Sequence, residues 1–82
     1  MLNQKDRLHY EYNQMYDILY VKIKDSYDTY VVEKTKGILV NHDYSTKEIT
    51  GFDIWDFKKR MENKEHLTLP IPVDFNNIYN SL

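Results

Sequence analysis

The chain opens with two stretches in which apolar and polar residues alternate, residues 8–12 and 19–24. A period of two indicates β-strands that bury one face. One antiparallel register places every apolar side chain of both stretches on the same face, by pairing Tyr12 with Leu19, Tyr10 with Val21, and Leu8 with Ile23. A slip of one residue would bury charged side chains, so the alternation itself predicts this register.

Three further strands follow, separated by turn residues at 25–28, by a break at 35–37 and by a hairpin loop at 43–47. We expect them at residues 29–34, from residue 38 onward, and at 48–55. Pairing Val40 with Thr50 and Ile38 with Phe52 joins the last two strands. Gly51 then lies in mid-strand, which predicts a β-bulge.

The period changes after residue 55. The spacing of Ile54, Phe57 and Met61 predicts an amphipathic helix at 56–64, with Asp53 or Asp56 near its N-cap. Residues 67–73 alternate again, but two prolines exclude a central strand, so this segment is an extended arm. A short final helix capped by Asp74 is predicted to share one apolar stripe, which consists of Phe75, Ile78, Tyr79 and Leu82.

These elements predict a single α+β domain over residues 1–82. It consists of a small antiparallel β-meander of four or five strands (8–55), a helix packed on one sheet face (56–64), and an extended arm with a short helix (67–82). The sheet is apolar on both faces, because Ile38, Val40, Phe52 and Ile54 share one face while Leu39, Ile49 and Trp55 share the other. One short helix covers only one face, so the arm is expected to close the second, within the chain or on a neighbour. This apolar surplus predicts a homodimer joined through strand edges or exchanged arms.

Residues 8–55 resemble a small bacterial family known as domain of unknown function 2283. Residues 12–23 are similar to its opening pattern, Tyr-Asp-x-x-x-Asp-x-Leu-Tyr-Ile, and residues 37–43 and 49–54 are similar to its second half. The chain departs from the family pattern at Asn13, Asn41, His42 and Lys47. The family has no established activity, but its members are often encoded beside small toxin-like proteins. The resemblance therefore implies an antitoxin or immunity role.

Composition excludes several classes of protein. The 82 residues contain no cysteine, which removes disulfide scaffolds, thiolate metal sites and cysteine nucleophiles. Two glycines are too few for a phosphate-binding or dinucleotide-binding loop. A formal net charge of -2 argues against a dedicated binder of the phosphate backbone. The chain has neither a long apolar run nor an apolar N-terminal stretch, so we expect a cytoplasmic protein without a membrane anchor.

Candidate chemistry is sparse. Asp17 and Asp43 are interpreted as turn residues that bond the local backbone. Asp43 and Asp53 could form a carboxylate pair, but no cleft is predicted around them. The histidines, His9, His42 and His66, belong to different elements. We therefore predict no catalytic residue, no metal site and no cofactor.

The function predicted from the sequence is a non-enzymatic protein-binding module, antitoxin-like or regulatory, that occludes the surface of a small protein encoded nearby. Its expected partner-binding residues are Tyr20, Leu69, Ile71, Phe75, Tyr79 and Leu82. A first alternative is a small nucleic-acid-binding protein that uses a sheet face with Tyr20, Lys22 and Lys24. A second alternative is a minor hydrolase that uses Asp43 and Asp53.

Overall fold

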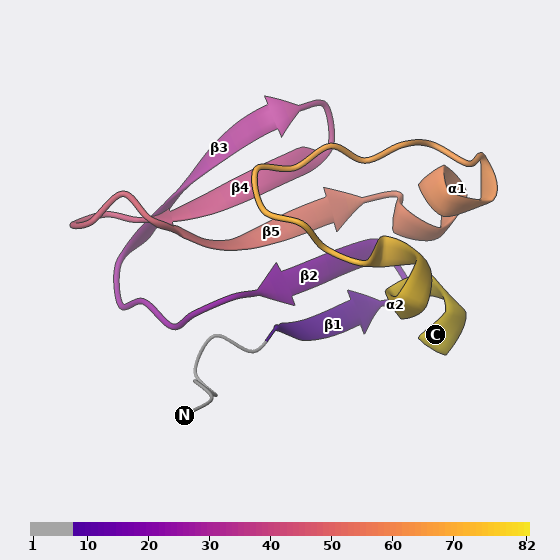
Figure 1. Ribbon diagram of the computed structural model, residues 1–82, viewed down its shortest axis with the longest axis horizontal. Helices are drawn as coiled ribbons and strands as arrows, with labels where there is room; N and C mark the ends of the chain where they lie inside the picture. The colour runs from indigo at the N-terminus through magenta and orange to yellow at the C-terminus, as the bar shows by residue number, and fades with distance from the viewer. Residues whose placement is uncertain (1–7) are drawn as a thin grey trace.

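The computed structural model describes residues 8–82, which form one five-stranded antiparallel sheet and two helices (Figure 1). In chain order the elements are β1 (His9–Asn13), β2 (Ile18–Lys22), β3 (Thr29–Thr35), β4 (Ile38–Asp43), β5 (Ile49–Trp55), α1 (Phe57–Glu62) and α2 (Phe75–Ser81). The predicted α+β class is confirmed. Between the helices, residues 67–73 form neither helix nor strand and bend at Pro70 and Ile71, so the segment is not extended throughout as predicted; we call it the arm.

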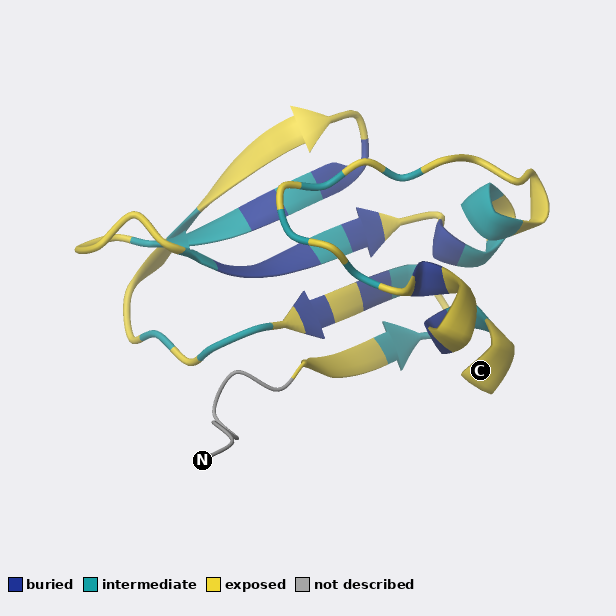
Figure 2. Cartoon of the chain, in the orientation of Figure 1, coloured by how far each residue is buried: buried dark blue, intermediate teal, exposed yellow. Residues whose placement is uncertain are grey.

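The strand order is β1-β2-β5-β4-β3, so one connection departs from a simple meander. β1–β2, β3–β4 and β4–β5 are antiparallel neighbours, whereas the chain after β2 crosses to the far edge of the sheet to begin β3. β5 takes the centre, where Phe52 and Ile54 are fully buried, while the valines of β3 remain exposed at the edge (Figure 2). The strand with the most buried residues thus occupies the central position of the sheet.

The register of the first hairpin is confirmed. Tyr12 pairs with Leu19 and Tyr10 with Val21, while His9 faces Lys22 on the other side of the sheet. Leu19 and Val21 are buried in the core. The alternation was sufficient to predict this register because a slip of one residue would place charged side chains in the core.

The register predicted for β4 and β5 is wrong by two residues. Val40 pairs with Phe52 and Ile38 with Ile54. An irregularity between Asn41 and His42 leaves Thr50 as the extra residue of β5, which is the bulge expected beside Gly51. The extra residue reverses the alternation, so Ile49 packs against the core rather than on the opposite face.

The hydrophobic core lies on one face of the sheet, which we call the covered face. α1, the arm and α2 all pack on this face, and the arm crosses in front of β4 and β5 in Figure 1. The expectation that the arm closes the second face is therefore wrong. All three segments contribute to covering this one face. The buried core residues are Leu19, Val21, Ile38, Val40, Phe52, Ile54, Phe57, Phe75 and Ile78.

The N-terminus of α1 is capped by a residue far away in sequence. The side chain of Asp56, at the N-cap position, makes no cap hydrogen bond, and Asp53 lies within β5. Instead Oδ1 of Asp17 accepts from the backbone N–H of Lys58 at 2.8 Å, and Oδ2 accepts from that of Lys59 at 3.3 Å. Asp56 therefore occupies the predicted N-cap position, but the side-chain cap comes from Asp17, and the interpretation of Asp17 as a purely local turn residue is wrong.

Tyr12 completes this arrangement. Its hydroxyl donates to Oδ1 of Asp17 at 2.6 Å, and its ring lies edge-on to Phe57 with centroids 6.4 Å apart. Burial and the bond to Asp17 raise the pKa of Tyr12 to about 12. Burial alone would raise the pKa of Asp17, but the bonds from Tyr12 and the helix N–H groups lower it overall. The β1–β2 turn is thereby tied to α1.

α2 begins as the sequence predicted. Asp74 is its N-cap, and Oδ1 of Asp74 accepts from the backbone N–H of Asn77 at 3.1 Å. Phe75 and Ile78 face the core. Within residues 8–82, neither helix is long and apolar enough to cross a membrane.

Candidate functional site

The second face of the sheet carries the candidate site, and we call it the open face because α1, the arm and α2 all lie on the opposite side. Strand pairing and alternation assign it side chains from all five strands. Its members are His9, Glu11, Tyr20, Lys22, Val31, Glu33, Leu39, Asn41, Gly51, Asp53 and Trp55. It combines aromatic, apolar and charged groups on a rigid sheet.

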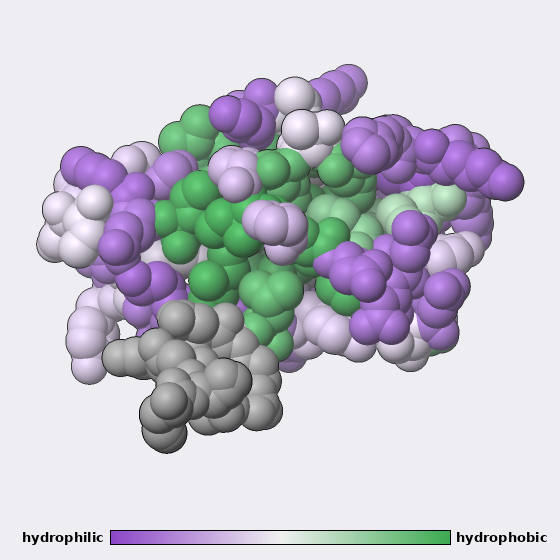
Figure 3. Space-filling view, viewed as in Figure 1, coloured by the Kyte–Doolittle hydropathy of each residue, from purple (hydrophilic) through white to green (hydrophobic). Residues whose placement is uncertain are grey.

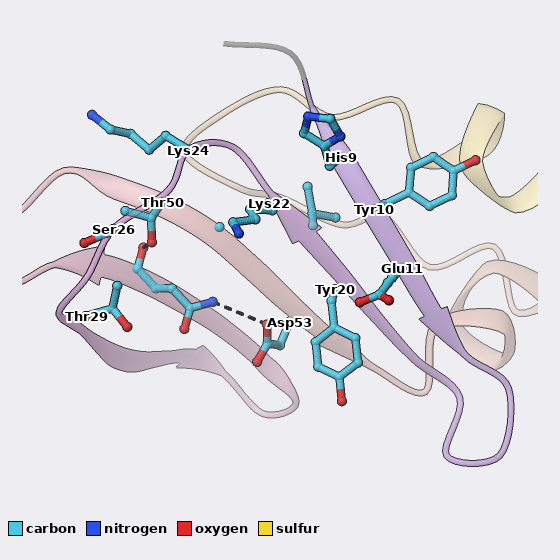
Figure 4. A pocket seen from close by; sticks show the side chains of 13 residues that line it. His9, Tyr10, Glu11, Tyr20, Lys22, Lys24, Ser26, Thr29, Thr50 and Asp53 are labelled. Carbon is cyan, nitrogen blue, oxygen red and sulfur yellow. Dashed lines mark hydrogen bonds between the residues drawn. The ribbon is translucent and has the colours of Figure 1, made fainter. Parts of the chain in front are cut away.

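A hollow of about 370 Å³ lies in the middle of this face. Figure 4 shows Tyr20, Lys22, Glu11 and Asp53 around it, while Tyr10 points away from the other side chains. Gly51 also lines the hollow. A Cβ at that position would lie 2.4 Å from the carbonyl oxygen of Val21, so only glycine permits β2 and β5 to approach this closely.

The carboxylate of Asp53 is a hydrogen-bond acceptor that lines the hollow. It lies opposite Tyr20 on β2 and Leu39 on β4, and Nδ2 of Asn41 donates to its Oδ1 at 3.3 Å. Burial raises the pKa of Asp53, and the bond from Asn41 offsets this in part. A half-buried carboxylate that accepts a single long hydrogen bond from the described residues, 8–82, has room for a further donor from a bound partner.

The lysines near the hollow have acidic partners within the chain. Lys22 Nζ lies 2.7 Å from Oδ1 of Asp25, and Lys24 pairs with Glu48. These pairs offset the positive charge that the nucleic-acid alternative would require.

Two aromatic side chains, together with Val31 at the edge, give this face its exposed apolar area. Tyr20 is 39% exposed and Trp55 is 49% exposed. Tyr20 was predicted as a partner-binding residue. Trp55 was not, although its position in the alternation after Phe52 and Ile54 already placed it on the face opposite the core.

The other predicted partner-binding residues lie on the covered side and are not brought together with Tyr20. Phe75 is buried, with its ring centroid 6.0 Å from that of Phe57. Leu69, Ile71 and Tyr79 are partly buried against the chain's own core, and Leu82 is exposed. Apolar side chains remain visible in the centre of this side (Figure 3), so a role of the arm in binding stays a prediction.

The carboxylates of the hydrolase alternative lie apart. Oδ1 of Asp43 accepts from the backbone N–H groups of Ser45 and Thr46, which confirms its local turn role. The hydrogen bond from the Ser26 hydroxyl has the largest effect on the pKa of Asp43, and together with these backbone bonds it lowers that pKa to about 2. Asp53 pairs with Leu39, four residues from Asp43 along β4, which is about 13 Å of strand. Paired carboxyl chemistry on glycosides uses separations of roughly 5–9.5 Å.

His9, His42 and His66 belong to no metal-binding cluster within residues 8–82, where no three suitable side chains come together. His42 instead stacks on Tyr30, with ring centroids 5.2 Å apart, and its Nδ1 lies 3.0 Å from the carbonyl oxygen of Lys47. These contacts hold the β4–β5 loop against β3.

No protein-family model matches the sequence, and no curated protein and no solved structure is detectably similar to it. The resemblance to the domain of unknown function 2283 therefore stays a prediction.

Proposed function

We propose that the chain is a non-enzymatic protein-binding module and that the open face is its binding surface. The observation that carries the proposal is the division of the sheet. Three segments of the chain cover one face, while the other exposes Tyr20, which lines the hollow, and Trp55 at the end of β5. Its partner is a small protein encoded nearby, which the module holds in an antitoxin-like or regulatory complex by occluding its active surface.

The residue types favour a protein as the partner. Tyrosine and tryptophan are enriched among the residues that dominate binding energy at protein interfaces, and their truncation there often costs about 2 kcal/mol or more. Tyr20 and Trp55 lie on the paired strands β2 and β5, which fix their backbone, and each side chain has only two χ angles, so little conformational freedom is lost on binding.

Asp53 supplies selectivity in this proposal. A docked partner would bury its carboxylate further, and a buried charge without a partner is costly. We therefore expect the partner to place a hydrogen-bond donor, such as a lysine, arginine or backbone N–H, over Asp53. A partner without such a donor would be discriminated against by several-fold or more.

The experiment is co-expression of the tagged chain with the product of each adjacent gene, followed by affinity measurement for any product that co-purifies. Tyr20→Ala and Trp55→Ala are each expected to weaken binding at least tenfold. Tyr27→Ala is the matched control, because Tyr27 is fully exposed on the β2–β3 connection outside the open face. Binding that is lost with Leu82→Ala but unchanged by both open-face substitutions would assign the function to the arm side instead.

The nucleic-acid alternative is separated by a gel-shift series at increasing salt. Phosphate contacts by Lys22 and Lys24 would give steep weakening with salt. The protein-binding proposal predicts no shift of DNA or RNA at low salt.

A further inference from the structure

β3 forms one edge of the sheet and has β4 as its single strand neighbour among residues 8–82. Its two valines are exposed on opposite faces. Val31 is 53% exposed on the open face, and Val32 is 43% exposed on the covered face because the covering segments do not reach this strand (Figure 2). We propose that the outer edge of β3 pairs antiparallel with β3 of a second copy of the chain. This inference does not depend on the proposed function.

The edge of β3 carries few of the features that prevent such pairing. An edge strand presents a row of backbone N–H and C=O groups that can bind another strand, unless prolines, inward-pointing charges, bulges or a covering segment block it. β3 contains no proline and is regular from Thr29 to Glu33, and its irregularity falls after that point, between Glu33 and Thr35. A five-residue ladder is therefore available.

Symmetry and charge select the register of the pair. Two identical antiparallel edges are related by a two-fold axis perpendicular to the sheet, so each residue faces one on the same face of the second copy. The regular part, residues 29–33, is centred on Val31, which places Val31 opposite Val31, Tyr30 opposite Val32, and Thr29 opposite Glu33 of the second copy. An aromatic residue beside a β-branched one is a favourable cross-strand pair.

Other axes are less favourable. An axis on Glu33 would place the two Glu33 carboxylates directly opposite each other, which is destabilising. An axis on Val32 would extend the ladder into the irregular part of the strand between Glu33 and Thr35. The register centred on Val31 avoids both.

The pairing would join two five-stranded sheets into one ten-stranded sheet. Because the axis is perpendicular to the sheet, both open faces lie on the same side and both covered faces on the other. The dimer would therefore present two identical open faces to one partner surface. The contact is limited to one strand from each copy and is smaller than standard interfaces of about 1,200–2,000 Å², so association is expected to be weak and concentration-dependent.

Cysteine crosslinking tests the register directly, because the natural chain contains no cysteine. In Val31→Cys the two cysteines face each other across a Cα separation of about 4.5–5.5 Å, which a disulfide spans. In the matched Thr29→Cys variant they are about 13 Å apart. We expect oxidation to produce covalent dimer from Val31→Cys at least tenfold faster than from Thr29→Cys. Equal rates, or no crosslink from Val31→Cys, would overturn the proposal.

Sedimentation of the natural chain and of charge variants tests the association itself. The natural chain is expected to show increasing dimer up to about 1 mM, the range of weak interfaces. Val31→Glu places like charges together and is expected to be monomeric, and mixing it with Val31→Lys is expected to restore a mixed dimer. A natural chain that stays monomeric, or a Val31→Glu variant that dimerises like the natural chain, would rule out this edge. Because Val31 is exposed, circular dichroism is expected to confirm that each variant remains folded.

Discussion

The two faces of this sheet are made by the same five strands, yet they differ in what they contact. The covered face places Leu19, Phe52 and Ile54 beneath three segments of the chain, and all three side chains are fully buried. The side chains of the open face alternate with those of the covered face along each strand, and this face exposes Tyr20 beside the hollow and Trp55 at the end of β5. The stability of the fold depends mainly on the first face, and the second is available to the partner that we propose.

This division explains why a chain of 82 residues needs its whole C-terminal third to close one core. A domain of this size buries only about 60–65% of its surface on folding, so little of the chain can be left without a packing role. α1 contributes Phe57 to the core and α2 contributes Phe75 and Ile78, while the arm packs between them. Covering both faces would require a longer chain or a partner.

Deletion of residues 67–82 is expected to cause the largest loss of stability, because these residues cover one of the two faces. It removes Phe75 and Ile78 and exposes the covered face, and each buried apolar side chain of this size contributes about 1.5–3 kcal/mol. A domain of this length has a total stability of roughly 4–12 kcal/mol. We expect loss of a cooperative urea transition and binding of the dye ANS. A truncated chain that unfolds cooperatively with the natural midpoint would show that the arm side is not required for the core.

Single truncations on the two faces compare them directly. Phe57→Ala is expected to lower the free energy of unfolding by about 3–5 kcal/mol, because its ring is fully buried between the sheet and α2. Trp55→Ala, only two residues earlier, is expected to cost less than about 1 kcal/mol because half of its surface is already exposed. Urea denaturation measures both. Similar losses for the two variants would contradict the division between the faces.

Gly51→Ala tests a structural requirement that lies on the open face. The added methyl group would meet the carbonyl oxygen of Val21 at 2.4 Å, which forces β2 and β5 apart. We expect a loss of about 2–3 kcal/mol, the range of overpacking in a tight interior. Thermal unfolding of this variant beside Thr29→Ala, an exposed strand position, gives the comparison. A Gly51→Ala variant as stable as the control would mean that the strands separate at no cost.

Asp17→Asn is expected to lower the free energy of unfolding by only about 1 kcal/mol at pH 7, because the helix N-cap bonds are retained in weaker form. The pKa of Asp17 is lowered below its ordinary value of 3.8 in the folded protein, so its charge stabilises the fold above that pH. This stabilisation is lost as the pH falls through the lowered folded value. The difference between the natural chain and Asp17→Asn should therefore shrink in urea titrations below about pH 4.

Asp53→Asn is the control for that pH dependence, since its pKa is raised rather than lowered. The charged form of Asp53 is disfavoured in the folded protein, so the natural chain gains stability relative to Asp53→Asn as the pH falls through the raised value. The stability of the natural chain relative to the variant should therefore decrease with falling pH for Asp17→Asn and increase for Asp53→Asn. The same sign for both would contradict the roles assigned to these carboxylates.

Local sequence patterns, in which residues close together in the chain carry the information, predicted much of this fold. The alternation at residues 8–24 gave the β1–β2 register, and the spacing after Asp74 gave α2 with its cap. In both cases neighbouring residues carry the information, because a slip in the strand or a shift of the helix stripe would bury polar groups.

Features set by distant contacts could not be predicted in this way. The cap of α1 comes from Asp17, 41 residues before Lys58, and no local pattern links the two. Arg60 was not recognised either, although its Nε donates to the carbonyl oxygen of Trp55 at 2.6 Å and its Nη2 to that of Lys36 at 2.8 Å. The alternating arm, residues 67–73, fits either face equally well by its sequence.

The candidate site was predicted only in part. Tyr20 was recognised as an exposed aromatic residue of a strand, but the hollow beside it depends on the strand order, which places β5 next to β2. The bulge at Thr50 reversed the faces predicted for the start of β5. An extra residue in one strand changes every assignment beyond it, and alternation alone does not show where that residue lies.

Trp55 is the chain's single tryptophan, so its fluorescence reports on the open face without interference from another indole. The most direct test of the account is acrylamide quenching of this emission at low micromolar protein concentration. We predict ready quenching, with emission typical of a partly hydrated indole, and protection once a co-purified partner is bound. An indole that resists quenching in the isolated chain would show that this face is already covered, and would contradict the central claim.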